Sequence, residues 1–495
     1  MEVIDSRIVL APAISLACAL LIFLSGGHAA WRATLALGAA ALKFAVILSL
    51  LPGSLQGTVY AYRLFDFPPG IGIAFRADAL GMFFALVSST LWVLTTVYAI
   101  GYMKDRPQKL RFFGFFSLCI STTVGIAFAE NLLTLLLCYE ALTVCTYPLL
   151  VHDETPEALR AGRKYLVYTL AGGALILFGV VMVQHLAGTL SLSHAGILPA
   201  DAPRPMLLAV FCALVAGFGV KAAVMPLHGW LPSAMVAPTP VSALLHAVAV
   251  VKAGVFGLLR VIYNVFGVEL LAMLGYAAWL AALAAFTIVA GSLMAMAQDN
   301  LKRRLAYSTV SQLSYIVLAA ALLTPLAALA AIAHIANQAF AKITMFFVAG
   351  AVEQATGRRH VHELAGMGRV MPWTMGAFTV ASLSFIGVPL FAGFVTKWYL
   401  SLGALQAEAW WFVLLMILSA LLNAAYWLPI VYLAWFRAPR GLPARVGETG
   451  WLLLAPTLAA AAYVVLLGVT TRVPGMPFSL AEAAVNFVSG TRGGG

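Results

Sequence analysis

Charged side chains are scarce in this chain of 495 residues. Asp, Glu, Lys and Arg together make up 9% of it, whereas soluble globular proteins carry about 25%. Hydrophobic residues make up 63%, and the mean hydropathy is +0.98. A water-facing surface cannot be built from this inventory, which excludes a soluble enzyme. The net charge of +11 does not indicate nucleic-acid binding, because the Lys and Arg residues fall in separate short loops instead of on one face.

Cysteine is rare, and its spacing is wrong for metal chemistry. The five cysteines all lie inside apolar runs and none forms a CxxC pair, which argues against a disulfide framework, a zinc site or an iron–sulfur cluster. The chain also lacks a GxGxxG segment with an acidic partner, the usual sign of a soluble redox domain. We therefore expect neither a metal nor a cofactor.

Long apolar runs are what the chain has in abundance. A helix that crosses a bilayer needs about 20 consecutive apolar residues, and runs without a period of two favour helices over a barrel. Glu2 and Asp5 precede the first run, and no small-residue cleavage site follows it, so we expect a retained helix and not a signal peptide. We predict an all-α integral membrane protein with fourteen transmembrane helices at about 7–24, 31–51, 79–100, 112–129, 131–151, 165–187, 206–225, 240–262, 271–295, 304–323, 327–351, 373–403, 410–436 and 451–469.

The basic residues of the predicted loops are distributed unevenly between the two sides. Of the 29 Lys and Arg residues, five lie within spans, seventeen fall on one side and seven on the other, where Arg260 is counted. Cytoplasmic loops of membrane proteins are enriched in Lys and Arg. We therefore predict a multi-pass protein of the cell inner (plasma) membrane with both termini on the non-cytoplasmic side.

Two of the predicted spans are interrupted. The seventh runs into a segment from Lys221 to Pro232 that contains two prolines, and the twelfth contains Gly387-Val388-Pro389. Proline breaks a helix, and broken backbone at membrane depth needs protein or a water-filled cavity around it. Because the interruptions are five spans apart, they indicate inverted repeats. We predict helices 1–3 over 1–111, two inverted five-helix repeats over 112–262 and 271–436, and a last helix with its tail over 437–495.

Five lysines and one glutamate lie deep inside predicted spans. A charge at the bilayer centre costs at least about 2.5–3.5 kcal/mol, so such a group must be paired, hydrated or neutral. Lysine can release its proton after burial, and histidine can relay protons near neutral pH. We predict a proton path through Glu140, Lys221, Lys252, His334, Lys342 and Lys397, with His228, His246, Gln338 and Asp299 as accessory candidates. For Lys43, the remaining lysine, snorkelling or a contact with a partner subunit is an equal alternative.

Other functions would use some of the same residues. A haem would need facing histidines, for which His246 and His334 are the candidates, although the surrounding lysines make the pocket unattractive. A quinone-holding redox subunit is a second alternative. A solute symporter is a third, but a row of lysines does not suit a small neutral solute.

Several motifs together resemble one membrane protein family. The chain from about Asp78 to Phe436 is similar to the antiporter-like proton-pumping subunits of respiratory complex I, membrane-bound hydrogenases and multisubunit (Mrp) Na⁺/H⁺ antiporters. The resemblance implies other membrane subunits, the lipid bilayer and H⁺ as partners, with Na⁺ as an alternative cargo. The motifs that carry it are Glu140 in Cys-Tyr-Glu, the segment from Lys221 to Pro232, His246 with Lys252-Ala-Gly254, and Asp299-Asn-Leu-Lys302-Arg303 with Ala306-Tyr307-Ser308.

The resemblance also implies roles for single residues. It makes Glu140 and Lys221 a coupled ion pair, Lys252 the central lysine, and Lys397 the charged residue of the second broken helix. Gln338 departs from the pattern, because many members have a second histidine there. The chain lacks the long lateral helix of the distal complex I subunit, so the D-type component of the Mrp antiporters or its hydrogenase relative fits best. A coupling subunit for inorganic-carbon uptake shares the fold and stays an alternative.

Overall fold

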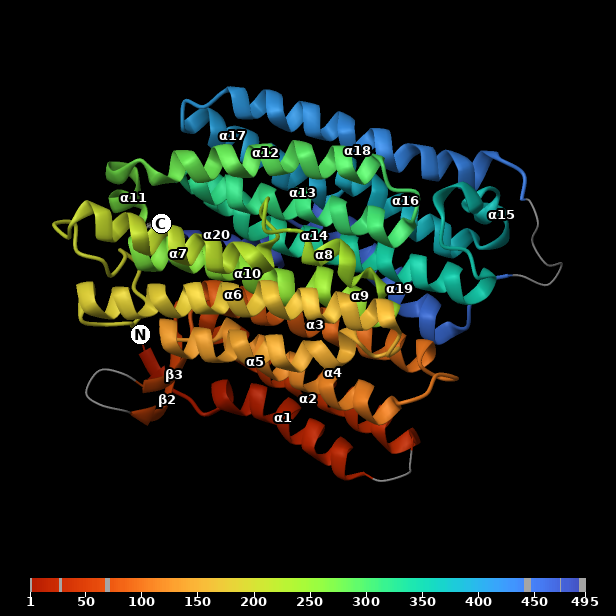
Figure 1. Cartoon of the computed structure of the whole chain (residues 1–495), viewed down its shortest axis with the longest axis horizontal. Coiled ribbons are helices and arrows are strands. Elements are labelled where there is room, and N and C mark those ends of the chain that lie inside the picture. The colour runs from red at the N-terminus through yellow and green to blue at the C-terminus, as the bar shows by residue number, and fades with distance from the viewer. Residues whose placement is uncertain (1, 26–28, 67–71, 440–446, 472, 489–495) are drawn as a thin grey trace.

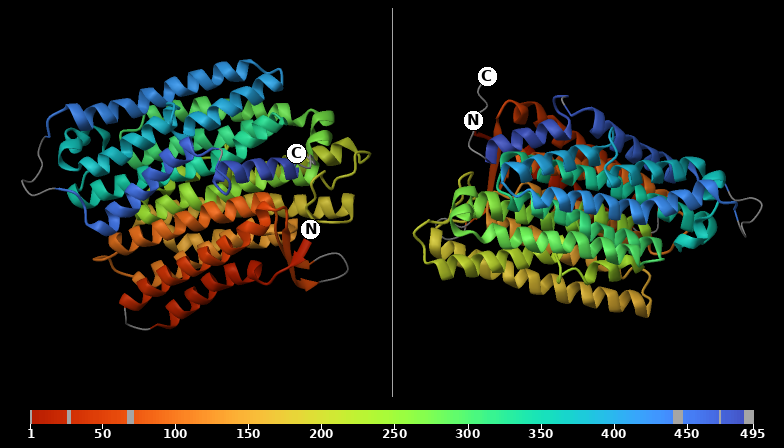
Figure 2. Two further views of the ribbon diagram at one scale, coloured as in Figure 1. Left: turned by 180° about the vertical axis from the view of Figure 1, so that it is seen from behind. Right: turned by 90° about the horizontal axis from the view of Figure 1, so that it is seen from above.

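Helices dominate the computed structural model, which describes residues 2–25, 29–66, 72–439, 447–471 and 473–488. Most of them lie side by side along the long axis of the molecule (Figure 1), and views from behind and from above show the same lengthwise packing (Figure 2). The helices up to the first break are α1 (Arg7–Leu24), α2 (Ala29–Leu55), α3 (Ala79–Tyr102), α4 (Lys109–Ala127), α5 (Leu132–Leu150), α6 (Pro156–Ala187) and α7 (Arg204–Ala222).

The helices after the first break include several short segments. The short α8 (Trp230–Ser233) and α9 (Thr239–Ala243) lead into α10 (Val250–Arg260), with the π-helical segments η2 (Leu244–Val248) before it and η3 (Val261–Phe266) after it. The remaining helices are α11 (Val268–Leu274), α12 (Tyr276–Met296), α13 (Leu301–Ala321), α14 (Pro325–Thr356), α15 (Met367–Val370), α16 (Pro372–Ile386), α17 (Ala392–Gln406), α18 (Trp411–Phe436), α19 (Trp451–Val469) and α20 (Pro477–Val488).

The predicted spans coincide with these helices. Twelve helical stretches among the described residues are long and apolar enough to cross a membrane, which confirms a multi-span helical protein. Two of the predicted spans are outside this set. One is α13, which has three basic residues in its first turn, and the other is divided between the separate helices α16 and α17. The exact number of fourteen crossings therefore stays a prediction.

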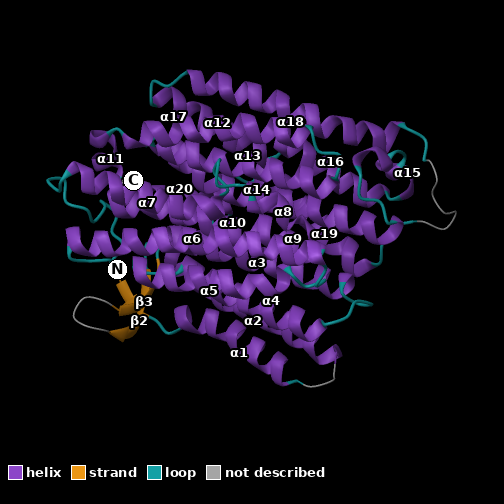
Figure 3. Ribbon diagram, viewed as in Figure 1, coloured by secondary structure: helices purple, strands orange, loops and turns teal. Residues whose placement is uncertain are grey.

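A small sheet departs from the predicted all-α fold. Strand β1 (Glu2–Ile4) pairs in parallel with β2 (Val59–Asp66), and β2 pairs antiparallel with β3 (Gly72–Ala77). The strands lie at one end of the bundle, next to the N-terminus (Figure 3). We call this the sheet end, and we call the opposite end, where α15 lies, the basic end (Figure 1). The last helix, α20, forms within the predicted tail.

Both predicted breaks are present, and protein groups satisfy the broken backbone. Helix α7 ends at Ala222, and the indole of Trp230 donates to the carbonyl of Val220 at 2.7 Å. Helix α16 ends at Ile386, after which Gly387 takes a φ of 96° that suits glycine. The carbonyls at that end accept hydrogen bonds from Lys397. Carbonyl groups at both breaks therefore accept hydrogen bonds from protein side chains, as broken backbone at membrane depth requires.

The centre of the bundle is formed by the stretch from α9 to η3 and by α14. The most apolar part of each of these two stretches is wholly buried, whereas only about one-third of the corresponding part of α1, α2 and α18 is buried. Thr324 begins α14 by accepting from the amide of Ala327, and Asp78 begins α3 by accepting from the amide of Gly81. The stretch from α9 to η3 carries Lys252 of the candidate site, and α14 carries His334, Gln338 and Lys342.

Candidate site of buried ionisable residues

Lys221 and Glu140 lie close together but do not form a direct ion pair among the described residues. The side chain of Lys221 is fully buried, and its Nζ donates to the main-chain oxygen of Tyr139 at 2.6 Å. The same Nζ lies 3.5 Å from the centroid of the Tyr139 ring. Tyr139 directly precedes Glu140, whose Oε1 is buried and has no hydrogen-bond partner in the described parts of the chain. A Cβ on Gly173 would lie 2.3 Å from that oxygen, so glycine makes room for the carboxyl group.

Lys252 joins the two central helices. Its side chain is 1% exposed, and its Nζ, on α10, donates to Oε1 of Gln338 on α14. The amide nitrogen of Gln338 is buried and has no partner among the described residues. Gln338 therefore takes part in the site directly, as the acceptor that links α10 to α14.

Lys342 lies one turn farther along α14 from Gln338. Its Nζ donates to the hydroxyl of Ser308 on α13 and lies 4.4 Å from the ring centroid of Phe385 and 5.4 Å from that of Trp427. The amine is completely buried. Its neighbours are one neutral hydroxyl and two aromatic faces, none of which carries a formal charge.

Lys397 lies against the end of α16. Its Nζ donates to the carbonyl oxygens of Phe385 at 2.6 Å and of Ile386 at 3.0 Å. One residue before it, Thr396 lies 2.9 Å from Nδ1 of His334. Phe385 therefore contacts Lys342 with its ring and Lys397 with its carbonyl oxygen, so the two lysines share a neighbour.

His334 is part of a polar network between helices. Its Nδ1 also lies 3.4 Å from the amide nitrogen of Asn337, which in turn accepts from Ser384 through its side-chain oxygen at 3.0 Å. The Nε2 of His334 is buried without a partner among the described residues, and the ring stacks on Tyr315. The network connects α14 to both halves of the second broken helix.

The accessory candidates are dispersed. His246 is fully buried and packs on Phe346, and neither of its ring nitrogens has a hydrogen-bond partner within the described segments. His228 is half-buried near Tyr307. Asp299 lies at the basic end, where its carboxylate accepts from Nδ1 of His360 at 3.1 Å and of His362 at 2.7 Å. The structure therefore keeps Asp299 away from the buried lysines.

Sequence reasoning missed a buried ion pair at the sheet end. Arg260 was counted among the loop charges, but its side chain is 1% exposed, and its two terminal nitrogens bind the carboxylate of Asp78 at 2.6 and 2.8 Å. Arg260 is the last residue of α10 and faces inward there. Lys43 is also fully buried, which does not fit snorkelling, and its Nζ lies 5.6 Å from the Trp92 ring centroid.

Comparisons with known proteins agree with this arrangement. Residues 129–423 match the family described as NADH:quinone oxidoreductase/Mrp antiporter, TM, and residues 69–113 match the complex I chain 5 N-terminus. The chain belongs to this family. It is 34% identical over 424 residues to NADH-quinone oxidoreductase subunit N of Desulforudis audaxviator, an alignment that covers 84% of this chain and 81% of the relative.

Other relatives come from different complexes. The chain is 35% identical over 367 residues to a probable K(+)/H(+) antiporter protein of Rhizobium meliloti, covering 73% of this chain but only 36% of that longer protein. Two solved structures share the fold with a TM-score of 0.89 and cover 98% of both chains. They are the archaeal membrane-bound sulfane sulfur reductase, at 24% identity, and the Mrp complex from Dietzia, at 21%. The family is confirmed, whereas the narrower resemblance to the D-type Mrp component stays a prediction.

Proposed function

We propose that the chain moves protons as an antiporter-like subunit of a multisubunit membrane complex. The row of buried groups is Glu140 with Lys221, then Lys252 with Gln338, then Lys342, and last Lys397 with His334 beside it. Relatives named as antiporter and NADH-quinone oxidoreductase subunits support this function. The chain would work beside other membrane subunits, with both termini and the sheet end on the non-cytoplasmic side, and H⁺ as its cargo.

The observation that carries the proposal is that the buried lysines have neutral partners. The ion pairs among the described residues involve none of Lys221, Lys252, Lys342 and Lys397. Each of the four instead donates to a carbonyl, an amide oxygen or a hydroxyl. A lysine that only held helices together would be expected to lie against a carboxylate, because an unpaired buried charge costs several kcal/mol. An amine with a neutral acceptor can exist with or without its proton.

Contacts between neighbouring groups support the order of the row from Lys252 to Lys397. Lys252 crosses from α10 to Gln338, and one helical turn along α14 leads to Lys342. Lys342 and Lys397 then meet at Phe385. Among the described residues, none of the four lysines of the row donates directly to another ionisable group, so water must carry the proton across the remaining steps.

Replacing lysine by arginine tests whether these residues exchange protons. Arginine keeps the positive charge but does not release its proton at accessible pH. We expect Lys252→Arg, Lys342→Arg and Lys397→Arg each to lower proton transport by about tenfold or more, nearly as much as alanine does, in vesicles that contain the assembled complex. Lys109→Arg, outside the row at the start of α4, is the matched control and should transport normally. Normal transport by the three arginine variants would refute the exchange of protons at these residues.

A further inference from the structure

A cavity of about 380 Å³ lies at the sheet end, between the outer part of α14 and the segment η3. Its walls are partly apolar and include Pro325 and Ala328. Four polar side chains also line it, those of His194, Tyr263, Glu269 and Thr324. The hydroxyl of Tyr263 is buried and has no hydrogen-bond partner among the described residues. Since a buried hydroxyl normally has a protein or water partner, the cavity is suited to hold water.

Measured along two neighbouring helical stretches, the cavity lies at the same distance from the contact between Lys252 and Gln338. Along α10 and η3, Tyr263 lies about 15 Å of helix from Lys252, and along α14, Ala328 lies about 15 Å from Gln338. Lys252 and Gln338 are in contact with each other. The cavity is therefore on the sheet-end side of the central lysine, about three helical turns from it, and a layer of buried side chains follows Lys252 in that direction.

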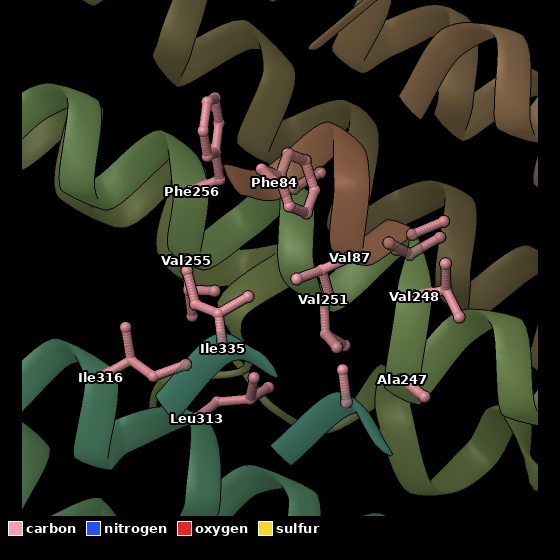
Figure 4. Packing of buried hydrophobic residues seen from close by; sticks show 14 of the residues in the cluster. Phe84, Val87, Ala247, Val248, Val251, Val255, Phe256, Leu313, Ile316 and Ile335 are labelled. Atoms are coloured by element: carbon pink, nitrogen blue, oxygen red, sulfur yellow. The ribbon is translucent and has the colours of Figure 1, made fainter. Parts of the chain in front are cut away.

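That layer is apolar. Phe84 on α3 stacks on Phe256 on α10 with the ring centroids 4.7 Å apart, and Val255 and Ile335 lie in the same cluster (Figure 4). Phe256 is one turn from Lys252 toward the sheet end, and Ile335 is one turn from Gln338 in the same direction. All four side chains are fully buried. A tightly packed apolar constriction excludes water and stops protons until it opens.

The buried charge that lies nearest to the apolar layer is paired. Arg260 lies one turn past Phe256 and would repel a proton if it were alone, but Asp78 binds both of its terminal nitrogens. Asn264 accepts from Arg260 and donates to the carbonyl of Ser193. The polar groups thus continue from the apolar layer to the wall of the cavity.

We propose that this cavity is a proton-release vestibule and that the stacked Phe84 and Phe256 rings form its gate. Protons that Lys252 receives from the rest of the row would leave through water held by Tyr263, His194 and Glu269. The proposal rests on the proton-translocating function proposed above and adds an outlet to it.

The gate is tested by removing a ring. We expect Phe256→Ala to raise the passive decay of a pH gradient by about tenfold or more in vesicles that contain the assembled complex, with no driving reaction, because a water-filled gap would replace the stack. Phe84→Ala, on the other helix, should do the same and covers the case in which the first variant does not assemble. A passive decay equal to that of the wild type in both assembled variants would overturn the gate.

The vestibule is tested by filling it. Ala328→Trp should reduce transport by about tenfold or more and should abolish the leak when it is combined with Phe256→Ala. Met273→Trp is the matched control, because Met273 lies on α11 near the cavity but is 56% exposed on the outer surface; it should transport normally. A leak that persists in the double variant, or normal transport by Ala328→Trp, would overturn the outlet. If Ala328→Trp transports normally while Lys252→Ala does not, only the outlet fails, whereas normal transport by Lys252→Ala refutes the proposed function itself.

Discussion

The buried pair of Asp78 and Arg260 allows a quantitative test of how the sheet end is held together. The two side chains are 2% and 1% exposed and share two hydrogen bonds of 2.6 and 2.8 Å. Removing one member of such a pair leaves an uncompensated buried charge and costs about 3–5 kcal/mol. We therefore expect Arg260→Met to lower the free energy of unfolding by about 3–5 kcal/mol.

The double variant separates the cost of the orphaned charge from the value of the pair. Asp78→Asn keeps an oxygen that can accept from the amide of Gly81 and so keeps the cap of α3, which is worth about 1 kcal/mol. In Asp78→Asn with Arg260→Met both charges are absent, and most of the lost stability should return, since a buried pair replaced by neutral groups is often neutral in effect.

The assay is unfolding of the purified protein in detergent micelles, followed by tryptophan fluorescence. The matched control is Asp66→Asn, which removes the exposed pair of Asp66 and Arg63 at the same end, 57% and 62% exposed, and should cost only about 0–1 kcal/mol. A double variant that is less stable than Arg260→Met would refute the reasoning, because it would show that the pair contributes stability beyond the cost of an orphaned charge.

Three further outcomes follow from the contacts. Glu140→Gln and Lys221→Ala should each abolish transport, and the double variant should be no worse than either, because the two act as one unit; independent, multiplicative losses would contradict this. Cysteine labelling with an impermeant reagent should reach Arg359→Cys from the cytoplasm and Arg63→Cys from the other side, and labelling of both from one face would overturn the topology. Partial burial raises the pKa of Asp299, but hydrogen bonds and charge from His362 outweigh it and hold this pKa below its ordinary value of 3.8. The stabilising contribution of the Asp299 carboxylate is therefore present above about pH 4 and is lost as the pH falls through the lowered pKa. Asp299→Asn should reduce the free energy of unfolding at pH 7 by less than about 1 kcal/mol and have no effect near pH 2. An equal loss at both pH values would contradict this.

Sequence patterns predicted the features that are local in the chain. Apolar runs marked the helices, and the residues from Lys221 to Pro232 and from Gly387 to Pro389 marked both breaks, because proline and glycine act on the backbone next to them. The strand Val59–Asp66 has buried or partly buried positions in its first half and exposed positions in its second, so it lacks the period of two that predicts a strand, and it lies between long spans.

Contacts between distant residues could not be read from the sequence. Asp78 and Arg260 are 182 positions apart, and only the packing of α3 against α10 brings them together. The acceptor role of Gln338 was hidden for the same reason, since its partner lies on another helix. A signal for Arg260 did exist, because it falls within the predicted span 240–262 and not in a loop.

The π-helical segment before α10 determines which way the helix after it faces. In Leu244–Val248 each turn holds about one residue more than an α-turn does, and each residue of an α-helix turns the following side chains by about 100°. The wide turn absorbs this extra residue, so if the same residues closed as an ordinary α-helix, the side chains after the segment would be rotated relative to those before it. The amine of Lys252 would keep its neighbours in sequence but would face about 100° away from Gln338. Angular phasing along one helix, and not only the presence of a lysine, therefore connects the two halves of the row.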